Sequence, residues 1–305
     1  MDLSMTIRIL AFFLVSFSLW AENKQPNIIY ILADDLGYNE LGCYGQKKIT
    51  TPNIDRIAAE GIKFTQHYSG QTVCAPSRCS FLTGKHMGHA YIRNNGEIKP
   101  NGQFPMAAGE VTIAEILKTK GYATACIGKW GLGIPGSVGD PNKQGFDFFF
   151  GYNCQRKAHH FYPEYLWKND QKVMYPDNNI YKGKNYSALE MKSEALNFVR
   201  ANKAKPFFLY WATPIPHVSL QVPDEANEKF GYKGKWPEKA FRGANISAWE
   251  KGGRKRKLGY TGHKTPRAAY AAMISLMDDN IGQLMKLLDE LKIADNTLII
   301  FTSDN

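Results

Sequence analysis

The chain has 305 residues, of which 44% are hydrophobic and 22% are charged. These two percentages are ordinary for a soluble globular protein. The length is sufficient for a domain that buries a substantial hydrophobic core. The formal net charge of +10 favours polyanionic partners, namely nucleic acid, acidic lipid or sulfated glycan. No nucleic-acid-binding motif accompanies the charge, so charge alone does not choose among these partners.

Residues 1–21 have the pattern of a signal peptide. Arg8 gives the beginning a positive charge, partly offset by Asp2, and residues 9–20 form an apolar stretch too short for a membrane span. We expect cleavage after Ala21, although Leu19 is larger than the residue preferred at that position. The alternative is an uncleaved membrane anchor. The prediction is an exported protein, periplasmic or secreted, with no stable membrane span and a catalytic domain over residues 22–305.

The cysteines carry information about the compartment but not about pairing. An odd number in an exported chain leaves at least one cysteine without a disulfide partner. The spacing assigns no pairing among the five cysteines, which are Cys43, Cys74, Cys79, Cys126 and Cys154.

Short apolar runs alternate with amphipathic segments along the chain. Such alternation predicts an α/β fold with a mostly parallel central sheet flanked by helices. The predicted strands are 27–33, 62–68, 122–127, 207–212 and 298–301, and the predicted helices are 51–60, 76–83, 112–120, 187–202 and a long one from 265.

Three further features concern organisation. Residues 131–186, rich in Gly, Pro, Asn and aromatics, are predicted to be a long insertion that forms a substrate-binding rim. The stripe Met273, Met277, Ile281, Leu284, Leu288 and Leu291 is predicted to be helix core rather than a cofactor site. The last predicted strand ends in polar residues at Asn305, from which we expect a fragment that lacks a C-terminal subdomain.

Two predicted strands end in acidic or amide side chains. Asp34 and Asp35 follow the first strand, and Asp304 and Asn305 follow the last one. Ligands bind at the carboxyl ends of parallel strands, and carboxylate and amide oxygens suit Ca²⁺ or Mg²⁺ better than zinc. An Asp-Asp pair alone is weak evidence for a metal site, because such pairs more commonly cap a turn.

Cys74 precedes Pro76, which suits the first turn of the predicted helix 76–83, with Gly84 at its end. The N-terminus of a helix attracts anions, and Arg78 adds a planar guanidinium suited to a tetrahedral oxyanion. A nucleophile and an anion site therefore fall within one turn. The alternative is a small buried cysteine under a loop.

Two further side chains follow predicted strands. Lys129 lies among glycines after the strand 122–127, where it can reach a bound anion. His217, after Pro214-Ile215-Pro216, would project at the catalytic edge, where a histidine can protonate a leaving oxygen. By themselves both have ordinary alternatives, a solvated lysine and a hydrogen-bonded loop histidine.

Taken together, these motifs resemble those of the type I, formylglycine-dependent sulfatases, which are arylsulfatase-like enzymes of the alkaline phosphatase superfamily. The matching segments are Cys74-Ala75-Pro76-Ser77-Arg78, Leu82-Thr83-Gly84, Gly128-Lys129-Trp130-Gly131-Leu132-Gly133, Pro216-His217 and the two acidic strand ends, in family order. The resemblance implies an alkaline-phosphatase-like fold. It also implies that Cys74 is converted to formylglycine by a maturase.

The resemblance further assigns roles to the site residues. It implies that Asp34, Asp35, Asp304 and Asn305 bind Ca²⁺, with Mg²⁺ as the alternative, together with the modified Cys74. It implies that Arg78 and Lys129 contact the sulfate and that His217 is the acid for the leaving group. The expected reaction is hydrolysis of a sulfate ester, with a sulfated carbohydrate favoured as the substrate.

The chain departs from the family at Gly131, where the family has a histidine thought to deprotonate the formylglycine hydrate. His86, His89, His159 and His160 are conceivable substitutes, and the sequence selects none of them. Two alternative functions stay open: a phosphate or phosphonate monoester hydrolase of the same superfamily, and a non-catalytic glycan-binding relative.

The basic segment 251–257 is predicted to be either a solvated loop or a patch that attracts a sulfated polymer, with Trp249 and Tyr260 as neighbours that could stack on sugar rings.

Overall fold

A computed structural model describes residues 25–98, 102–243 and 260–305. The predicted signal peptide and the basic segment 251–257 lie outside the described residues, as does Trp249.

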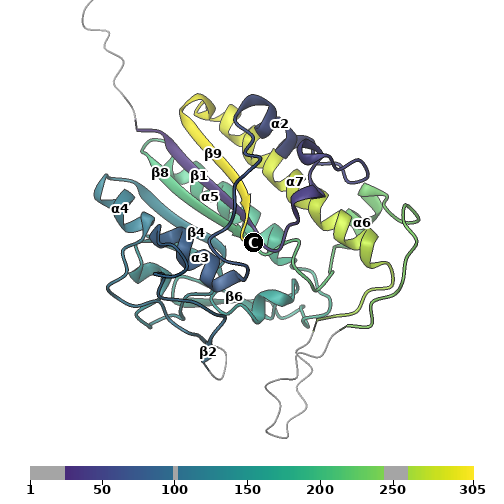
Figure 1. The fold of residues 1–305 in the computed structure, drawn as a ribbon, viewed down its shortest axis with the longest axis horizontal. Helices are drawn as coiled ribbons and strands as arrows, with labels where there is room; N and C mark the ends of the chain where they lie inside the picture. Colours follow the sequence, from purple (N-terminus) through teal and green to yellow (C-terminus); the bar gives the residue numbers. More distant parts are fainter. Residues whose placement is uncertain (1–24, 99–101, 244–259) are drawn as a thin grey trace, which may run out of the picture.

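A seven-stranded sheet in the order β7-β6-β5-β4-β8-β1-β9 forms the centre of the fold (Figure 1). The five strands from β5 to β9 in this order are parallel, and the hairpin β6–β7 continues the sheet in antiparallel fashion. A separate two-stranded sheet pairs β2 with β3. The strands are β1 Asn27–Ala33, β2 Glu97–Ile98, β3 Gly102–Gln103, β4 Ala123–Lys129, β5 Phe148–Tyr152, β6 Tyr165–Lys168, β7 Gln171–Met174, β8 Phe207–Thr213 and β9 Thr297–Ser303.

Helices cover both faces of the sheet and give three layers (Figure 1). One core lies on the face of the sheet packed by α5 and α7, and the other lies on the face packed by α3 and α4. The α-helices are α2 Pro52–Glu60, α3 Cys74–Thr83, α4 Ile113–Thr119, α5 Ser187–Asn202, α6 Asp224–Phe230 and α7 Pro266–Glu290, and the short 3-10 helices are η1 Tyr38–Glu40, η2 Gly42–Tyr44, η3 Pro141–Lys143, η4 Lys157–His159 and η6 Ala294–Asn296.

The observed elements confirm the predicted α/β class and most of its parts. The fully buried strands β4 and β8 consist of apolar, aromatic or small residues except for Lys129 at the end of β4, because helices cover both of their faces. Along α7, five members of the predicted stripe are buried, and Leu291 packs against the same core. Among the described residues, no helix is long and apolar enough to cross a membrane.

Two predictions were wrong. The predicted strand 62–68 does not form, and its side chains are exposed, because no neighbouring strand pairs with it. The segment 131–186 is not a simple insertion on the rim, since it contributes β5, β6 and β7 to the sheet itself. Its short strands escaped detection because glycine and polar residues interrupt the apolar pattern on which strand prediction depends.

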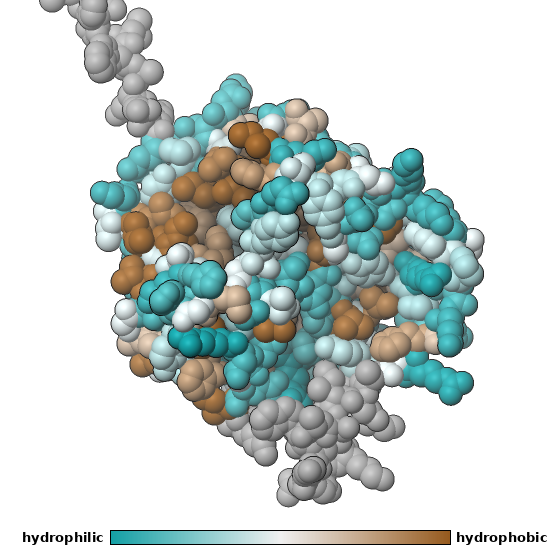
Figure 2. All heavy atoms as spheres, in the orientation of Figure 1, coloured by the Kyte–Doolittle hydropathy of each residue, from teal (hydrophilic) through white to brown (hydrophobic). Residues whose placement is uncertain are grey.

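One edge of the sheet keeps an apolar surface. Leu298 and Ile300 of the edge strand β9 are 52% and 36% exposed, and they share a face with Ile28 and Tyr30 of β1. Figure 2 shows hydrophobic side chains gathered around β9 and β1. An unpaired edge strand of this kind is open to further strand pairing.

A buried carboxylate joins helix α7 to the start of α2. Asp278 accepts hydrogen bonds from the backbone N–H groups of Asn53 and Ile54 at 3.2 and 2.8 Å and from the Asn53 amide at 2.8 Å. It therefore satisfies donors that the first turn of α2 leaves free. Asp278 therefore has a structural role, since it holds the start of α2 against α7.

We predict that Asp278→Ala lowers the free energy of unfolding by about 2–3 kcal/mol, because it leaves buried N–H donors without partners. Asp279→Ala is the matched control, since Asp279 pairs with Lys229 at the surface and its loss should cost less than about 1 kcal/mol. Urea unfolding followed by circular dichroism measures both, and equal losses would contradict the cap role.

Candidate active site

The candidate site lies where β1, β4, β8 and β9 end at the same edge of the sheet. In the parallel register, Ala33 pairs with both Thr213 and Ser303. The residues that follow are therefore neighbours: Asp304 N–H donates to Ala33 O at 3.0 Å, and Asp35 N–H donates to the Asp304 carboxylate at 3.1 Å. This register brings the two predicted acidic strand ends together.

Helix α3 brings Cys74 to the same edge. The helix begins at Cys74, two residues earlier than predicted, with Val73 as its N-cap and Gly84 in the left-handed conformation at its end. The Cys74 thiol is 7% exposed, and burial is the main cause that raises its pKa to about 11. An unmodified Cys74 would therefore stay protonated at neutral pH and be a weak nucleophile despite its place at the helix N-terminus.

A fully buried network of charges lies behind Cys74. Lys129, the last residue of β4, donates to both carboxylate oxygens of Asp34 at 3.0 and 2.7 Å. Arg78 bridges Asp34 at 3.2 Å and Asp304 at 2.8 Å, and it also donates to the backbone oxygen of Lys129 at 2.6 Å. None of these four side chains has access to solvent.

The network shifts the pKa values of its two buried carboxyl groups, Asp34 and Asp304, in opposite directions. Burial alone would raise the pKa of Asp34, but the Lys129 ammonium, helped by His217 and Arg78, holds it well below its usual range. Burial and the neighbouring Asp34 carboxylate raise the pKa of Asp304 to about 7. The two buried cations pair with Asp34 and Asp304, whereas a third carboxylate, the partly exposed Asp35, lies beside His217 and adds negative charge to the site.

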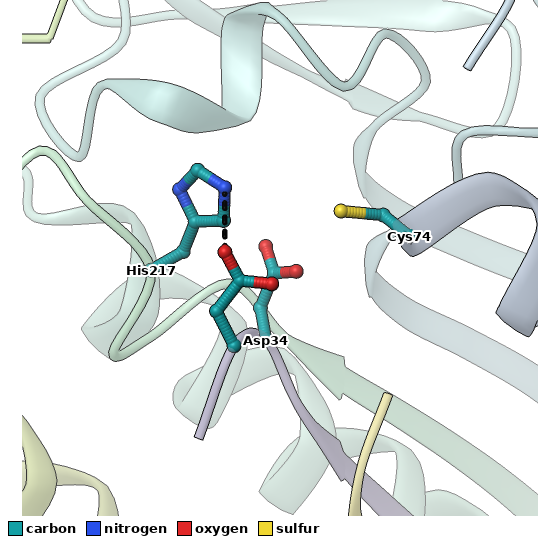
Figure 3. Close-up of side chains that lie close together, drawn as sticks. Asp34, Cys74 and His217 are labelled. Carbon is teal, nitrogen blue, oxygen red and sulfur yellow. Dashed lines mark ion pairs between the residues drawn. The ribbon is translucent and has the colours of Figure 1, made fainter. Parts of the chain in front are cut away.

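His217 lies on the other side of the carboxylates from Cys74 (Figure 3). Its Nε2 is 3.1 Å from Asp35, and its Nδ1 is bonded to the backbone oxygen of Val218. Burial is the main cause that lowers the pKa of His217. One ligand atom each from Asp34, Asp35, Cys74 and His217 lies within 4.8 Å of the others.

The donor set fits the divalent cation that the sequence predicted. The three carboxylates outnumber the two buried cations, so a bound metal cation would balance the remaining negative charge. Their oxygens are hard ligands of the kind that Ca²⁺ and Mg²⁺ prefer. The Asn305 amide lies 2.7 Å from Asp35 and 3.1 Å from Asp304, so it too is within the cluster.

His159 and Tyr260 complete one wall of the site. The His159 ring stacks on His217, with centroids 4.6 Å apart and planes at 5°, and Tyr260 lies 5.2 and 5.8 Å from the two rings. Burial, then the charges of His217 and Lys129, holds the pKa of His159 well below its usual range. His86 and His89 are exposed, and His160 is buried, so the structure places His159 at the site among the four candidates.

Gln155 occupies the space beside Gly131, and no pattern in the sequence predicts this contact. A Cβ at Gly131 would lie 2.8 Å from Gln155 Cγ, and the φ of +77° at Gly131 disfavours a side chain there. Gln155 Nε2 donates to Asn95 Oδ1, which also accepts the N–H of Ala75 next to Cys74. A chain of amides thus links the glycine position to the start of α3.

The comparisons with known proteins decide the family. The family model described as Sulfatase matches residues 26–305. The chain belongs to the sulfatase family. It is 32% identical to the human N-acetylgalactosamine-6-sulfatase over 92% of the chain, and 32% identical to mouse Arylsulfatase J over 93%. The chain spans 50% of the length of the former and 43% of the latter.

Solved structures agree with this sulfatase fold. The crystal structure of Ps i-CgsB in complex with k-i-k-neocarrahexaose is 30% identical, with a TM-score of 0.72 over 92% of the chain and 59% of the solved one. The phosphonate monoester hydrolase of Agrobacterium radiobacter, at 21% identity and a TM-score of 0.61, shares the fold.

We predict that Gly131→Ala lowers the free energy of unfolding of this chain. A side chain in the left-handed conformation costs about 1–2 kcal/mol, and the clash of the added Cβ with Gln155 adds a further cost. Gly136→Ala is the control, because Gly136 has a φ of +82° but no atom within 4 Å of the added Cβ. Combining Gly131→Ala with Gln155→Ala should recover the clash portion. Thermal unfolding of the three variants and the unchanged protein measures these costs, and identical losses for the two single glycine variants would contradict the packing argument.

Proposed function

We propose that this chain forms a sulfuric ester hydrolase site that releases inorganic sulfate from a sulfated carbohydrate. The observation that carries the proposal is the convergence of Asp34, Asp35, Cys74 and His217 within 4.8 Å. Family membership over residues 26–305 supports it. Because the chain spans about half the length of its curated relatives, the activity of the whole protein is part of the proposal.

Arg78 and Lys129 would bind and orient the sulfate group. Both are buried beside Cys74, and both already lie within hydrogen-bond distance of Asp34. Their positions are therefore fixed before a substrate arrives, which is the condition for electrostatic stabilisation without reorganisation. Their positive charges would offset the charge that develops on the sulfuryl oxygens.

Two groups that the family implies would complete the chemistry. Asp34, Asp35, Asp304 and Asn305 would hold Ca²⁺, or alternatively Mg²⁺, which polarises a substrate oxygen. Cys74, once converted to the aldehyde formylglycine by a maturase and hydrated by the addition of water, would supply a hydroxyl nucleophile in place of its protonated thiol.

His217 would donate a proton to the oxygen of the leaving alcohol. It lies across the carboxylates from Cys74, as expected for a group that acts on the opposite side of the sulfur (Figure 3). Burial is the main cause that lowers its pKa and disfavours the protonated ring, whereas the neighbouring carboxylates of Asp34 and Asp35 favour the protonated form that the acid role requires. Its Nδ1 bond to Val218 fixes the orientation of the ring.

A sulfated carbohydrate is the favoured substrate class. N-acetylgalactosamine-6-sulfatase names a sulfated sugar, and Ps i-CgsB was solved with a neocarrahexaose. The positive net charge of the chain favours such a polyanion. With the signal-peptide pattern of residues 1–21, we propose that the enzyme acts after export, in the periplasm or outside the cell.

The test is to co-express the chain with a maturase, add Ca²⁺, and measure sulfate release from sulfated oligosaccharides and from 4-nitrophenyl sulfate. Mass spectrometry of the Cys74 peptide should show formylglycine, and Cys74→Ala should abolish release. Faster hydrolysis of phosphate or phosphonate monoesters would favour the rival hydrolase. Glycan binding without turnover by the modified protein would favour the non-catalytic alternative, and an active protein with an unmodified thiol would refute the proposed nucleophile.

We predict that His217→Ala lowers kcat for a sugar sulfate by about 10²–10⁴-fold, because the leaving alkoxide then lacks its proton donor. The loss should be much smaller with 4-nitrophenyl sulfate, since 4-nitrophenolate leaves without protonation. His67→Ala is the control and should leave both rates unchanged, because His67 is exposed and its ring contacts Phe64 rather than His217. Equal losses on both substrates would argue against the acid role.

A further inference from the structure

A cavity lies beside the end of β5, at the hairpin β6–β7. Its volume is about 250 Å³, below the roughly 300–1,000 Å³ of sites for drug-sized ligands, so it suits one small unit such as a single sugar ring. The walls that matter for binding are Tyr165 and Trp167 of β6, Lys172 of β7, Lys157, and Asn153 after β5.

The sheet register explains why the cavity exists. Gly151 pairs with Trp167, so the strand next to the tryptophan carries no side chain at this point. Trp167 also pairs with Lys172, and Tyr165 lies two residues before Trp167, so these three side chains share one face of the hairpin. The indole and phenol rings meet edge to face at 5.9 Å and form an aromatic wall.

Two ammonium groups are held at this wall. Lys172 lies 4.5 Å from the Tyr165 ring and 5.4 Å from the Trp167 ring, and Lys157 lies 5.1 Å from the Tyr165 ring. Neither lysine forms an ion pair with a carboxylate in the described ranges 25–98, 102–243 and 260–305. The rings limit the motion of the ammonium groups and leave their charge free for an anion.

Asn153 adds an unsatisfied amide. Its side chain is 2% exposed and lines the cavity, and neither its Nδ2 nor its Oδ1 has a hydrogen-bond partner. Both amide atoms are closed off from solvent, so Asn153 contributes to the wall of the cavity without presenting its amide to a ligand. The polar groups that a ligand meets are therefore the two lysines.

The backbone connects this cavity to the candidate active site. Trp130 N–H donates to Tyr152 O at 2.9 Å, and Gly131 N–H donates to Asn153 O at 3.3 Å. The residues that line the cavity thus pair directly with the loop that follows Lys129. A ligand that fills both places would be longer than one sugar unit.

We propose that this cavity, with Tyr165, Trp167, Lys157, Lys172 and Asn153, binds an anionic sugar unit of the glycan that the active site hydrolyses. The inference rests on the proposed sulfatase function for the identity of the glycan. The anionic group is a sulfate or a carboxylate on that sugar, which the two lysines bind, and the aromatic wall packs against its ring.

The test uses Cys74→Ala protein, which cannot turn substrate over, and calorimetric titration with hexasaccharides of carrageenan, chondroitin sulfate and heparan sulfate. At least one should bind. In the same background, Lys157→Ala combined with Lys172→Ala should weaken that binding at least tenfold. Lys182→Ala combined with Lys203→Ala, two exposed lysines elsewhere, changes the net charge equally and should weaken it less than twofold.

Three further arms define the ligand chemistry. Loss of binding on desulfation of the sugar identifies sulfate as the recognised anion, and retained binding of desulfated chondroitin identifies the carboxylate. Equal binding of fully desulfated carrageenan, which is neutral, would overturn the proposal. So would equal affinity of the two double-lysine variants, or failure of every oligosaccharide to bind.

These outcomes are separable from the failure of hydrolysis. If the modified wild-type protein releases no sulfate while the pocket lysines still control binding, the proposed reaction is refuted and the proposed role of the cavity is supported. If sulfate is released but the pocket lysines do not affect binding, the proposed reaction is supported and the proposed role of the cavity is refuted. Circular dichroism and melting temperature of each variant show whether it is folded.

Discussion

The buried ion network of Asp34, Lys129, Arg78 and Asp304 is the constraint on which the rest of the site depends. These groups come from β1, β4, α3 and the end of β9, so the network forms only when four separate elements are in place. Burying such charges is costly unless each is paired, and breaking one pair leaves an uncompensated charge in the interior. The same contacts that hold the strands and the helix together therefore also place the cations beside Cys74.

The strand ends could be predicted from the sequence because buried parallel strands have a plain pattern. Residues 27–33 and 207–212 are continuous apolar runs, and polar residues after such runs lie at the functional edge. The order of the strands was not predicted. It depends on which apolar surfaces meet across the chain, and a single sequence does not encode that in any local pattern.

Other parts of the site were beyond sequence reasoning for identifiable physical reasons. His159 belongs to a short 3-10 helix in an irregular region, and only its stacking on His217 marks it as part of the site. Gln155 is separated from Gly131 by 24 positions along the chain (155 − 131), and only the fold shows that one fills the space left by the other. The strands β6 and β7 are short and carry lysines, so neither resembles a buried strand.

The burial of Cys74 has a consequence for the order of events in the life of the chain. With eight of its residues buried, helix α3 is covered along most of its length, and the Cys74 side chain is 7% exposed. A second enzyme cannot reach a side chain that is covered in this way. Any catalyst that modifies Cys74 must therefore act on the newly made chain before α3 packs against the sheet, so that slow modification and fast folding would compete for the same molecules.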